Sequence, residues 1–573
     1  MILQGIAVSK GVVTGRAFVY EPFKPEITEH IINKEDIPES IKRYQEITAL
    51  AGQELSTLRD KMKEIDEDKA GIFQAHQDIL NYSAMGDEIL SLIQTEYYSP
   101  EFAIETVYEK FIQILSSMDD DIIRERCADL KDVKNRILRL WMGVTSKDLS
   151  QIEEPAVVFA KDLLPSDTAT LNKEKVLAIV TEVGGNTSHS AIIARSYEIP
   201  ALLGIPGVMN EISEGDSIIV DALEGKLIIS PSPKEAEAYI KKQKEYQDYM
   251  QNLKEYQGIE PYTKDGQRVS VCLNIGSVTD EELASAVFTD GVGLFRSEFL
   301  FMSGKELPSE NQQFEVYKKA AETYGDRQVI LRTLDIGGDK TLECMELPKE
   351  DNPFLGCRAL RLCFRKTDLF KTQLRAALRA AVYGNLAIMF PMVGSMEDIT
   401  KAKGCLQEAK DELKAEGIPY NEHIKVGIMI EIPAIALMAD IIAKEVDFAS
   451  IGTNDLCQYL MAVDRLNPDV AVYYQSYHPA MFKLISFVSE AFQKERKTLG
   501  ICGEMGGDPM AAMVFLGLGI KKLSMVAPSI AGVKKMITKI DMVTAKAIAE
   551  KVIHMSTAFE IEEYLKTEFE KFM

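Results

Sequence analysis

The second half of the chain alternates short strand-like runs with helical stretches eight times, and this alternation limits the possible folds more than any other feature. Eight βα units in about 300 residues are typical of a (β/α)8 barrel, in which parallel strands close on themselves inside a ring of helices. We therefore predict a TIM barrel for this half of the chain. The expected strands are Val269–Asn274, Gly291–Phe295, Val329–Leu334, Ala387–Met392, Lys425–Ile430, Asp447–Ile451, Leu499–Cys502 and Lys522–Met525.

The first half predicts a smaller α/β unit. Leu3–Val8 and Gly15–Tyr20 are expected to form a strand pair, and a helix is expected over Ser188–Glu198. The chain as a whole is therefore predicted to be a multidomain α/β protein. The other expected strands of the small unit are Pro155–Phe159, Val176–Val180, Ala201–Leu203, Ser217–Asp221 and Lys226–Ile229.

A helical segment, residues 24–143, is predicted to be inserted into this α/β unit, which comprises residues 1–23 and 144–230. The segment holds 15 basic and 25 acidic residues, a net charge of −10. It is a candidate docking surface for a protein with a basic patch. Six apolar residues are spaced to fall on one helical face: Ile123, Cys127, Leu130, Val133, Ile137 and Trp141.

Between the two halves, residues 231–260 are polar and nearly free of helix-breaking residues. This composition indicates a solvated helical linker that lets two bodies move relative to each other. The barrel is then assigned to residues 261–573. These boundaries divide the chain into an α/β unit, an inserted helical lobe, a linker and a barrel.

Composition excludes several classes of function. The chain holds 65 basic and 88 acidic residues, a net charge of −23, which argues against sequence-independent nucleic-acid binding. The longest apolar run, Ile428–Ala443, is interrupted by Glu431, Pro433 and Asp440, so we expect no membrane insertion. Eight cysteines without a CxxC pair do not suggest a disulfide framework. We expect a reduced, cytoplasmic protein.

Charged side chains follow the expected barrel strands, and the strand ends of such a barrel meet at one mouth. Arginines suit bidentate binding of phosphate or carboxylate, and carboxylates suit Mg²⁺. Any single arginine could be a rim salt bridge, but the clustering of the whole set favours a site for a small, highly charged anion with Mg²⁺. The set comprises Arg296, Arg332, Asp335, Arg358, Glu431, Asn454, Asp455, Arg465, Cys502 and Glu504.

Cys502 stands at the end of an expected buried strand, in the run GICGEMGGD. A buried cysteine is more often a packing residue than a catalytic one. At the mouth of an anion site, however, a thiol with an ordinary pKa of about 8.5 can act as a proton donor at neutral pH.

His189 lies in VTEVGGNTSHSAIIAR, where Thr187 or Ser188 is expected to cap the following helix. The free N–H groups and positive dipole of a helix N-terminus disfavour an imidazolium and favour an anionic phosphoimidazole. The alternative is an exposed histidine near a cap. A second histidine, His76, is expected on the exposed face of the helical lobe, where it and the acidic residues Glu64, Asp66, Glu67 and Asp68 are candidate contacts for the docked protein.

Several of these motifs resemble the Enzyme I family of the phosphoenolpyruvate-dependent sugar phosphotransferase system, over essentially the whole chain. GGNTSHSAIIAR resembles the phosphohistidine segment of that family. The order of helical lobe, histidine domain and barrel is similar as well. The motifs that resemble the family's phosphoenolpyruvate-binding barrel are DGVGLFRSEFLFM, ILRTLDIGGDK, DNPFLGCRALR, MIEIPA, IGTNDLCQYLMAVDR and ICGEMGGD.

The resemblance implies that phosphoenolpyruvate phosphorylates His189 on Nε2 and that pyruvate is released. The phosphoryl group would then pass to a histidine of the phosphocarrier protein HPr, docked on the helical lobe. It also implies a homodimer formed through the barrel. The implied site residues are Arg296, Arg332, Arg358, Asn454, Asp455 and Arg465 for the substrate, Glu431 and Asp455 for Mg²⁺, and Cys502 as proton donor to the enolate.

The sequence departs from the family pattern at two positions. Asn186 stands where the family usually has arginine, which removes one positive charge near His189, and Val526 stands where a small polar residue is usual. These departures leave the implied catalytic groups in place.

Three other functions share some of these features. Pyruvate phosphate dikinase and phosphoenolpyruvate synthase share the histidine domain and the barrel but need an ATP-binding domain, and no glycine-rich nucleotide loop is visible here. A carbon–carbon lyase would use Mg²⁺ and the arginines but leaves His189 without a role. A non-catalytic sensor of phosphoenolpyruvate would not need Cys502, Glu431 and Asp455.

Overall fold

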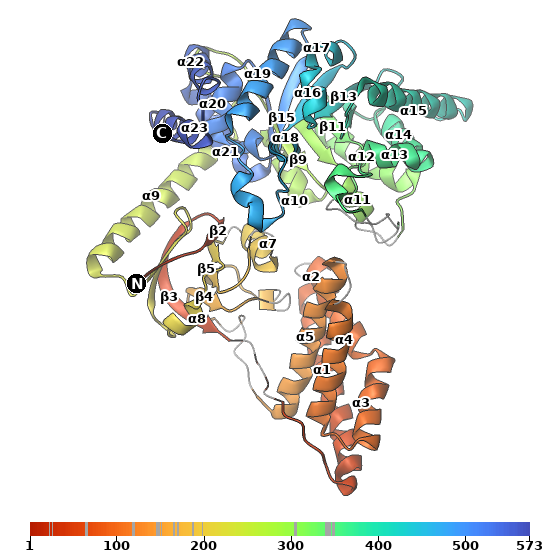
Figure 1. The fold of residues 1–573 in the computed structure, drawn as a ribbon, viewed down its shortest axis with the longest axis vertical. Helices are drawn as coiled ribbons and strands as arrows, with labels where there is room; N and C mark the ends of the chain where they lie inside the picture. The colour runs from red at the N-terminus through yellow and green to blue at the C-terminus, as the bar shows by residue number, and fades with distance from the viewer. Residues whose placement is uncertain are drawn as a thin grey trace. The chain divides into compact units, whose positions relative to one another are not determined.

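The computed structural model in Figure 1 contains two compact units, Met1–Tyr249 and Met250–Met573. Each unit is built around its own β-sheet. The structure describes the chain apart from residues 22, 24, 26, 64–66, 117–120, 145–148, 150–151, 164–166, 169–170, 186–187, 198, 303–305, 338–344, 346–349 and 573.

The second unit is a closed barrel of eight parallel strands, which confirms the predicted (β/α)8 fold. The first and last strands pair with each other, so the sheet has no free edge. The observed strands agree with the expected ones to within two residues at either end. They are β9 Ser270–Ile275, β10 Gly291–Arg296, β11 Gln328–Arg332, β12 Leu386–Phe390, β13 Lys425–Ile430, β14 Phe448–Gly452, β15 Thr498–Cys502 and β16 Lys522–Met525.

The barrel strands read as continuous apolar runs because both of their faces are buried. One apolar layer fills the interior and includes Ile330, Met389, Met429 and Phe448. A larger layer lies between the strands and the helices that surround them. The helices are α10 Asp280–Leu283, α11 Glu298–Met302, α12 Glu310–Tyr324, α13 Leu360–Arg365, α14 Thr367–Ala380, α15 Met396–Ala415, α16 Pro433–Leu437, α17 Ala439–Ile442, α18 Thr453–Met461, α19 Pro479–Lys494, α20 Pro509–Gly517, α21 Ile530–Lys539, α22 Met542–Val552 and α23 Ala558–Glu570.

The sheet of the first unit has the strand order β1-β8-β7-β3-β4-β5-β6-β2. The small α/β fold is as predicted, but the expected pairing of the first two strand runs is wrong. The chain breaks at Gly5, so that β1 pairs with β8 and β2 pairs with β6, while β3 lies between β7 and β4. The elements are β1 Ile2–Gln4, β2 Ile6–Ser9, β3 Val12–Tyr20, β4 Ala156–Ala160, β5 Val176–Thr181, α7 His189–Ser196, β6 Ala201–Leu203, α8 Val208–Glu211, β7 Ser217–Asp221 and β8 Lys226–Ile229.

The segment between β3 and β4 forms a helical lobe, as its pattern predicts. The predicted apolar face of its last helix is confirmed at Cys127, Leu130, Val133 and Ile137, which are buried. His76 is not on an exposed face: its side chain is fully buried, and its Nε2 lies 3.2 Å from a carboxylate oxygen of Asp129. The helices are α1 Ile37–Lys63, α2 Glu67–Leu80, α3 Ser83–Thr95, α4 Pro100–Ser116 and α5 Asp121–Met142.

The expected linker forms one long helix, α9 Pro233–Gln257. In its first half, which belongs to the first unit, Lys242 makes a 2.5 Å ion pair with the buried Asp221 of the same unit. At its end, which belongs to the second unit, the carbonyl of Gln257 accepts a hydrogen bond from Lys534 of that unit. Within the described parts of the chain, no helix is long and apolar enough to cross a membrane.

Candidate active site

Two of the predicted arginines end neighbouring strands of the barrel. Arg296 closes β10, Arg332 closes β11, and the two residues are paired in register. The buried guanidinium of Arg332 contacts the carboxylate of Glu298 and lies 2.9 Å from Asp335. Burial alone would lower the pKa of Arg332, but Asp335 and Glu298 raise it. Arg332 is therefore a fixed, permanently charged group.

Arg296 has a different environment. It makes no hydrogen bond or ion pair with the residues that the structure describes, and its guanidinium lies 5.0 Å from the ring centre of Phe299. Burial lowers the pKa of Arg296, and the positive charge of Arg332 lowers it further. A half-buried cation without a carboxylate partner favours an anionic ligand.

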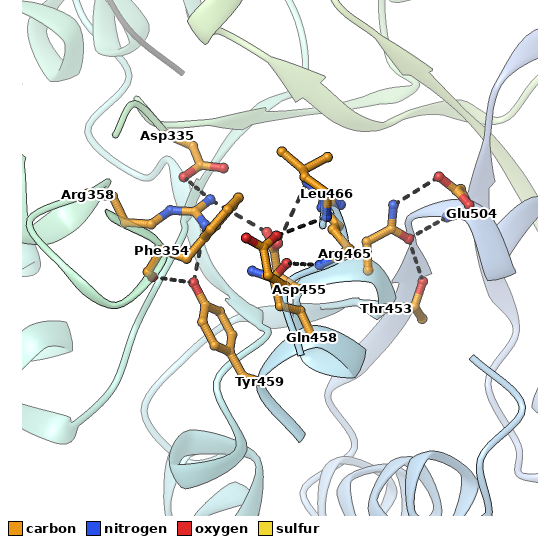
Figure 2. Close-up of polar contacts among 12 residues, drawn as sticks. Asp335, Phe354, Arg358, Thr453, Asp455, Gln458, Tyr459, Arg465, Leu466 and Glu504 are labelled. Carbon is orange, nitrogen blue, oxygen red and sulfur yellow. Dashed lines mark hydrogen bonds and ion pairs between the residues drawn. The ribbon is translucent and has the colours of Figure 1, made fainter. Parts of the chain in front are cut away.

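Arg358 lies across the mouth, in the loop after β11, and its side chain is fully buried. Figure 2 shows its guanidinium between Asp335, at 2.9 Å, and Asp455, at 3.6 Å. It also donates to the hydroxyl of Tyr459 at 3.2 Å. Arg465 lies farther from Asp455, at 3.9 Å. Residues predicted to follow β11 and β14 thus meet around Asp335 and Asp455.

Glu431 and Asp455 are the carboxylates best placed to hold a divalent cation. Glu431 follows β13 and is buried, and its Oε1 accepts a 2.5 Å hydrogen bond from the N–H of Met392. Burial raises the pKa of Glu431, and the nearby charges of Asp455 and Asp335 raise it further. The buried Oδ1 of Asp455 has no hydrogen-bond partner among the described residues. Two crowded carboxylates with spare oxygen atoms fit a hard cation such as Mg²⁺.

A metal cage made by the protein alone is not formed by the part of the chain that the structure describes. No group of three or more histidine, cysteine, aspartate or glutamate side chains has the spacing to hold a metal ion there. Mg²⁺ commonly takes only one or two protein carboxylates and completes its shell with water and substrate phosphate. The carboxylate pair therefore suits a cation that arrives with a phosphorylated substrate.

Cys502 is the last residue of β15, and its side chain is 1% exposed. Its thiol donates to the carbonyl of Ile451 at 3.4 Å. Burial raises the pKa of Cys502 to about 11. The thiol is therefore protonated at neutral pH, as a proton donor must be.

Asn454, in α18 directly after β14, joins this segment to the segment that follows β15. Its side-chain oxygen accepts from the N–H of Glu504 at 3.0 Å, and its amide group donates to the carboxylate of Glu504 at 3.3 Å. The hydroxyl of Thr453 donates to the carbonyl of Cys502 at 3.1 Å. These contacts hold Cys502 and Asp455, on neighbouring strand ends, in a fixed relation.

His189 is in the first unit, where its backbone begins helix α7. Ser188 is the helix cap, and its hydroxyl accepts from the N–H of Ala191 at 3.3 Å, in agreement with one of the two predicted caps. Gly184 has a φ of 111°, a left-handed conformation that glycine adopts without strain. The other expected cap, Thr187, and the unusual Asn186 lie outside the described residues.

Comparison with known protein families distinguishes between the functions named above. The family model for the phosphoenolpyruvate-binding domain of phosphoenolpyruvate-utilising enzymes matches residues 250–542. The models for the N-terminal and mobile domains match residues 4–126 and 152–225. The phosphoenolpyruvate-protein phosphotransferase of Geobacillus stearothermophilus is 44% identical over 568 residues, which cover 99% of this chain and 98% of that protein. The chain belongs to the phosphoenolpyruvate-protein phosphotransferase family.

Other members of the phosphoenolpyruvate-protein phosphotransferase family are similarly close. The Bacillus subtilis protein is 41% identical, with 99% of both chains covered. The Staphylococcus aureus protein is 41% identical, with 98% of both chains covered. This family membership confirms the resemblance read from the sequence motifs.

In this member of the phosphoenolpyruvate-protein phosphotransferase family, two site residues were missed by sequence reasoning. Glu298, which contacts Arg332, is a fully buried acid at the start of a short apolar helix, two residues after Arg296. Its position beside a strand end could have identified Glu298 as a site residue from the sequence. Tyr459 contacts Arg358 and donates to the carbonyl of Phe354 at 2.7 Å. No sequence pattern indicates this contact, because it joins helix α18 to a segment about 100 residues earlier in the chain.

Proposed function

We propose that this chain transfers the phosphoryl group of phosphoenolpyruvate to its own His189, releases pyruvate, and passes the group to a histidine of HPr. The observation that carries the proposal is the charge arrangement at the barrel mouth. Arg296 lacks a carboxylate partner among the described residues, and it stands in register with the buried, permanently charged Arg332. A protonated thiol, Cys502, ends a strand of the same barrel.

In the proposed reaction, Arg296 and Arg332 hold the phosphate. Arg358, Arg465 and the Asn454 region complete the substrate site together with Asp455. The bond between phosphorus and the enol oxygen breaks, and a bond forms to Nε2 of the neutral His189 imidazole. The methylene carbon of the enolate then takes a proton from the Cys502 thiol, which gives pyruvate and a thiolate that solvent protonates again. Positioning and charge stabilisation by the arginines supply most of the catalysis.

Glu431 and Asp455 would hold Mg²⁺ in this site. When bound, the ion neutralises negative charge on the phosphate and on the enolate oxygen. The fit rests on the buried carboxylate pair and on Oδ1 of Asp455, which accepts no hydrogen bond from the described residues. Arg358 lies 3.6 Å from Asp455, and both Arg358 and Arg332 contact the neighbouring Asp335, so positive charge lies beside the carboxylates without metal.

The helical lobe, residues 24–143, is the proposed docking site for HPr. A groove of about 410 Å³ in this lobe is lined by apolar residues that include Ile79, Phe111 and Leu130, and by Asp78. The other proposed domains are an α/β domain at 1–23 and 144–230, a linker at 231–260 and a barrel at 261–573.

The proposed location is the cytoplasm, because the seven described cysteines are free thiols.

The direct test is phosphorylation of the protein by labelled phosphoenolpyruvate with Mg²⁺. The wild-type chain is expected to gain an acid-labile, base-stable label, and His189→Ala is expected to gain none. His423→Ala, which changes an exposed histidine of the barrel, is the matched control and should label normally. Stable label on His189→Ala would contradict the proposal.

A further inference from the structure

A buried hydrogen-bond network lies beside the ends of strands β10 and β11. Its centre is Gln373 of α14, whose side chain is fully buried on a helix face that is otherwise apolar. Gln373 Oε1 accepts from the N–H of Leu334 at 2.8 Å. Its Nε2 donates to the hydroxyl of Ser297 at 2.9 Å and to the hydroxyl of Tyr317 at 3.1 Å. A buried amide is tolerated only when its hydrogen bonds are made, as they are here.

The hydrogen positions in this network have one consistent arrangement. The backbone N–H of Leu334 can only donate, so it requires the oxygen of Gln373, and the amide group of Gln373 must then face Ser297 and Tyr317. The hydroxyl of Ser297 accepts from that amide and donates to the carbonyl of Arg332 at 2.7 Å. The network therefore has a defined direction and ends on the backbone of an active-site arginine.

The other branch ends on the helix layer. The hydroxyl of Tyr317, on α12, donates to the side-chain oxygen of Gln313 at 3.2 Å. The amide group of Gln313 donates to the carbonyl of Pro308 at 2.9 Å. Ser297, Tyr317 and Gln313 are all fully buried, so water does not compete for these contacts. The strand ends are thus tied to two helices through one amide.

The residues that this network holds are adjacent to the proposed phosphate site. Ser297 directly follows Arg296, and the two backbone groups held at the end of β11 belong to Arg332, its last residue, and to Leu334, two residues later. Arg296 and Arg332 are register partners on neighbouring strands. We infer that Gln373 is a positioning residue that sets the spacing of the Arg296 and Arg332 side chains for phosphoryl transfer. This inference rests on the proposed role of the two arginines.

The test is single-turnover labelling of the full-length protein by phosphoenolpyruvate. Gln373→Met keeps the length and volume of the side chain but removes both donors and the acceptor. It is expected to slow labelling by about tenfold or more, since small displacements of positioned groups cost rate steeply. The phosphoenolpyruvate concentration for half-maximal rate should change less, because both arginine charges remain. Ser297→Ala, a smaller change that cuts the contact to Arg332, should slow labelling in the same way even if Gln373→Met does not fold.

A double-mutant cycle separates positioning from general stability. In an Arg332→Lys background, Gln373→Met or Ser297→Ala should add little further loss, because residues that act through one another are not additive. Ser489→Ala is the control. It removes the 2.8 Å hydrogen bond from a buried outer-helix hydroxyl to Leu518, and it should leave the labelling rate unchanged.

Three results would overturn the inference. They are fully additive losses in the cycle, a similar slowing in Ser489→Ala, or wild-type labelling by both Gln373→Met and Ser297→Ala. If Arg332→Lys alone labels at the wild-type rate, the phosphate role of Arg332 fails first, and the positioning role fails with it. If Arg332→Lys labels slowly but Gln373→Met and Ser297→Ala label at the wild-type rate, the proposed function stands. Only the positioning role of Gln373 is then rejected.

Discussion

At the scale of single residues, the same side chain has different chemistry at different positions of the mouth. Arg332 and Arg358 are buried against carboxylates, whereas Arg296 has none within bonding distance among the described residues. The carboxylates hold the guanidinium groups of Arg332 and Arg358 in place, whereas Arg296 has no such contact, and all three arginines are proposed to bind the substrate. Position also distinguishes the cysteines, because only Cys502 among the described cysteines ends a barrel strand.

Cys502→Ala is expected to slow pyruvate formation at least about tenfold while leaving His189 labelling within a few-fold of wild type, because protonation follows phosphoryl transfer. In the unchanged chain, the raised pKa of the Cys502 thiol, about 11, also predicts how pyruvate formation depends on pH. The donor is lost only when the thiol ionises, so pyruvate formation should show no loss from thiol ionisation between about pH 7 and 9. Pyruvate release measured across this range checks both points. A normal rate in Cys502→Ala would mean that Cys502 only packs.

Glu431→Gln is expected to weaken Mg²⁺ binding by about tenfold or more, because it removes one of two charged ligands. Calorimetric titration with Mg²⁺ measures this without turnover, and the Mg²⁺ concentration for half-maximal labelling should rise in parallel. Glu322→Gln, on the exposed face of α12, is the control. Unchanged Mg²⁺ affinity in Glu431→Gln would remove Glu431 from the ligand set.

At the scale of elements, the site depends on close approach between neighbouring strand ends. Gly503 follows β15 with a φ of 92°, and a β-carbon there would lie 2.5 Å from Thr453 Oγ1 and 2.9 Å from Asn454 Oδ1. Gly337 is similar: a β-carbon there would lie 2.7 Å from the β-carbon of Arg358. Glycine at these positions lets the loops after strands three, six and seven meet.

Gly503→Ala is expected to lower the free energy of unfolding by about 1–3 kcal/mol, because alanine is strained at this φ and displaces Asn454. Labelling by phosphoenolpyruvate should fall as well. The control is Gly404→Ala in the exposed middle of α15, where no atom lies within 4 Å of the added carbon. That change should stabilise the protein by up to about 1 kcal/mol. Thermal unfolding of both variants measures the effect, and equal melting temperatures would contradict it.

At the scale of the whole molecule, exposed apolar side chains on the barrel helices bear on the proposed dimer. Leu437 of α16 is 64% exposed, and Ile441 of α17 and Phe487 of α19 are also exposed. Helices α16 and α17 both pack against α19. Exposed apolar side chains on neighbouring helices are candidates for an interface.

The chain is therefore expected to sediment as a dimer, and Leu437→Glu is expected to shift it towards monomer, because a charge would be buried in the interface. Val543→Glu changes an exposed apolar residue of α22 and should not alter the association state. Sedimentation velocity across a concentration series measures both variants. A wild-type chain that stays monomeric at all accessible concentrations would reject dimerisation.

The acidic helical lobe predicts salt-sensitive transfer to HPr. Charges on this surface are screened over about 8–10 Å at physiological salt, so added salt should weaken transfer more than it weakens His189 labelling. Asp78→Asn with Asp87→Asn, at the edges of two grooves on the lobe, should raise the HPr concentration for half-maximal transfer several-fold. Glu174→Gln in the α/β unit is the control. If labelling and transfer fall together, the lobe serves folding rather than docking.

The structure revises some of the contact residues predicted from the sequence for this docking surface. His76 cannot be a surface contact, because it is buried against Asp129. Glu64 and Asp66 lie outside the described residues, and only the backbone of Glu67 and Asp68 is described. Asp78 and Asp87 are exposed and lie at the grooves, which makes them the better variants to test.

The sequence by itself determined the barrel, its strand positions and the residues gathered at its mouth. Parallel strands buried on both faces are visible as apolar runs, and their ends must meet at one mouth whatever the details of packing. The cap at Ser188 was also a local property, since it depends on residues within one turn of His189.

Only the tertiary structure decided which partners these residues have. The separation of β1 from β3, the burial of His76, the contact of Glu298 with Arg332 and the network around Gln373 all join segments that are distant in sequence. Strand partners and buried polar contacts depend on which faces pack together in three dimensions. Side-chain periodicity shows that a face is buried, but it does not show what lies against it.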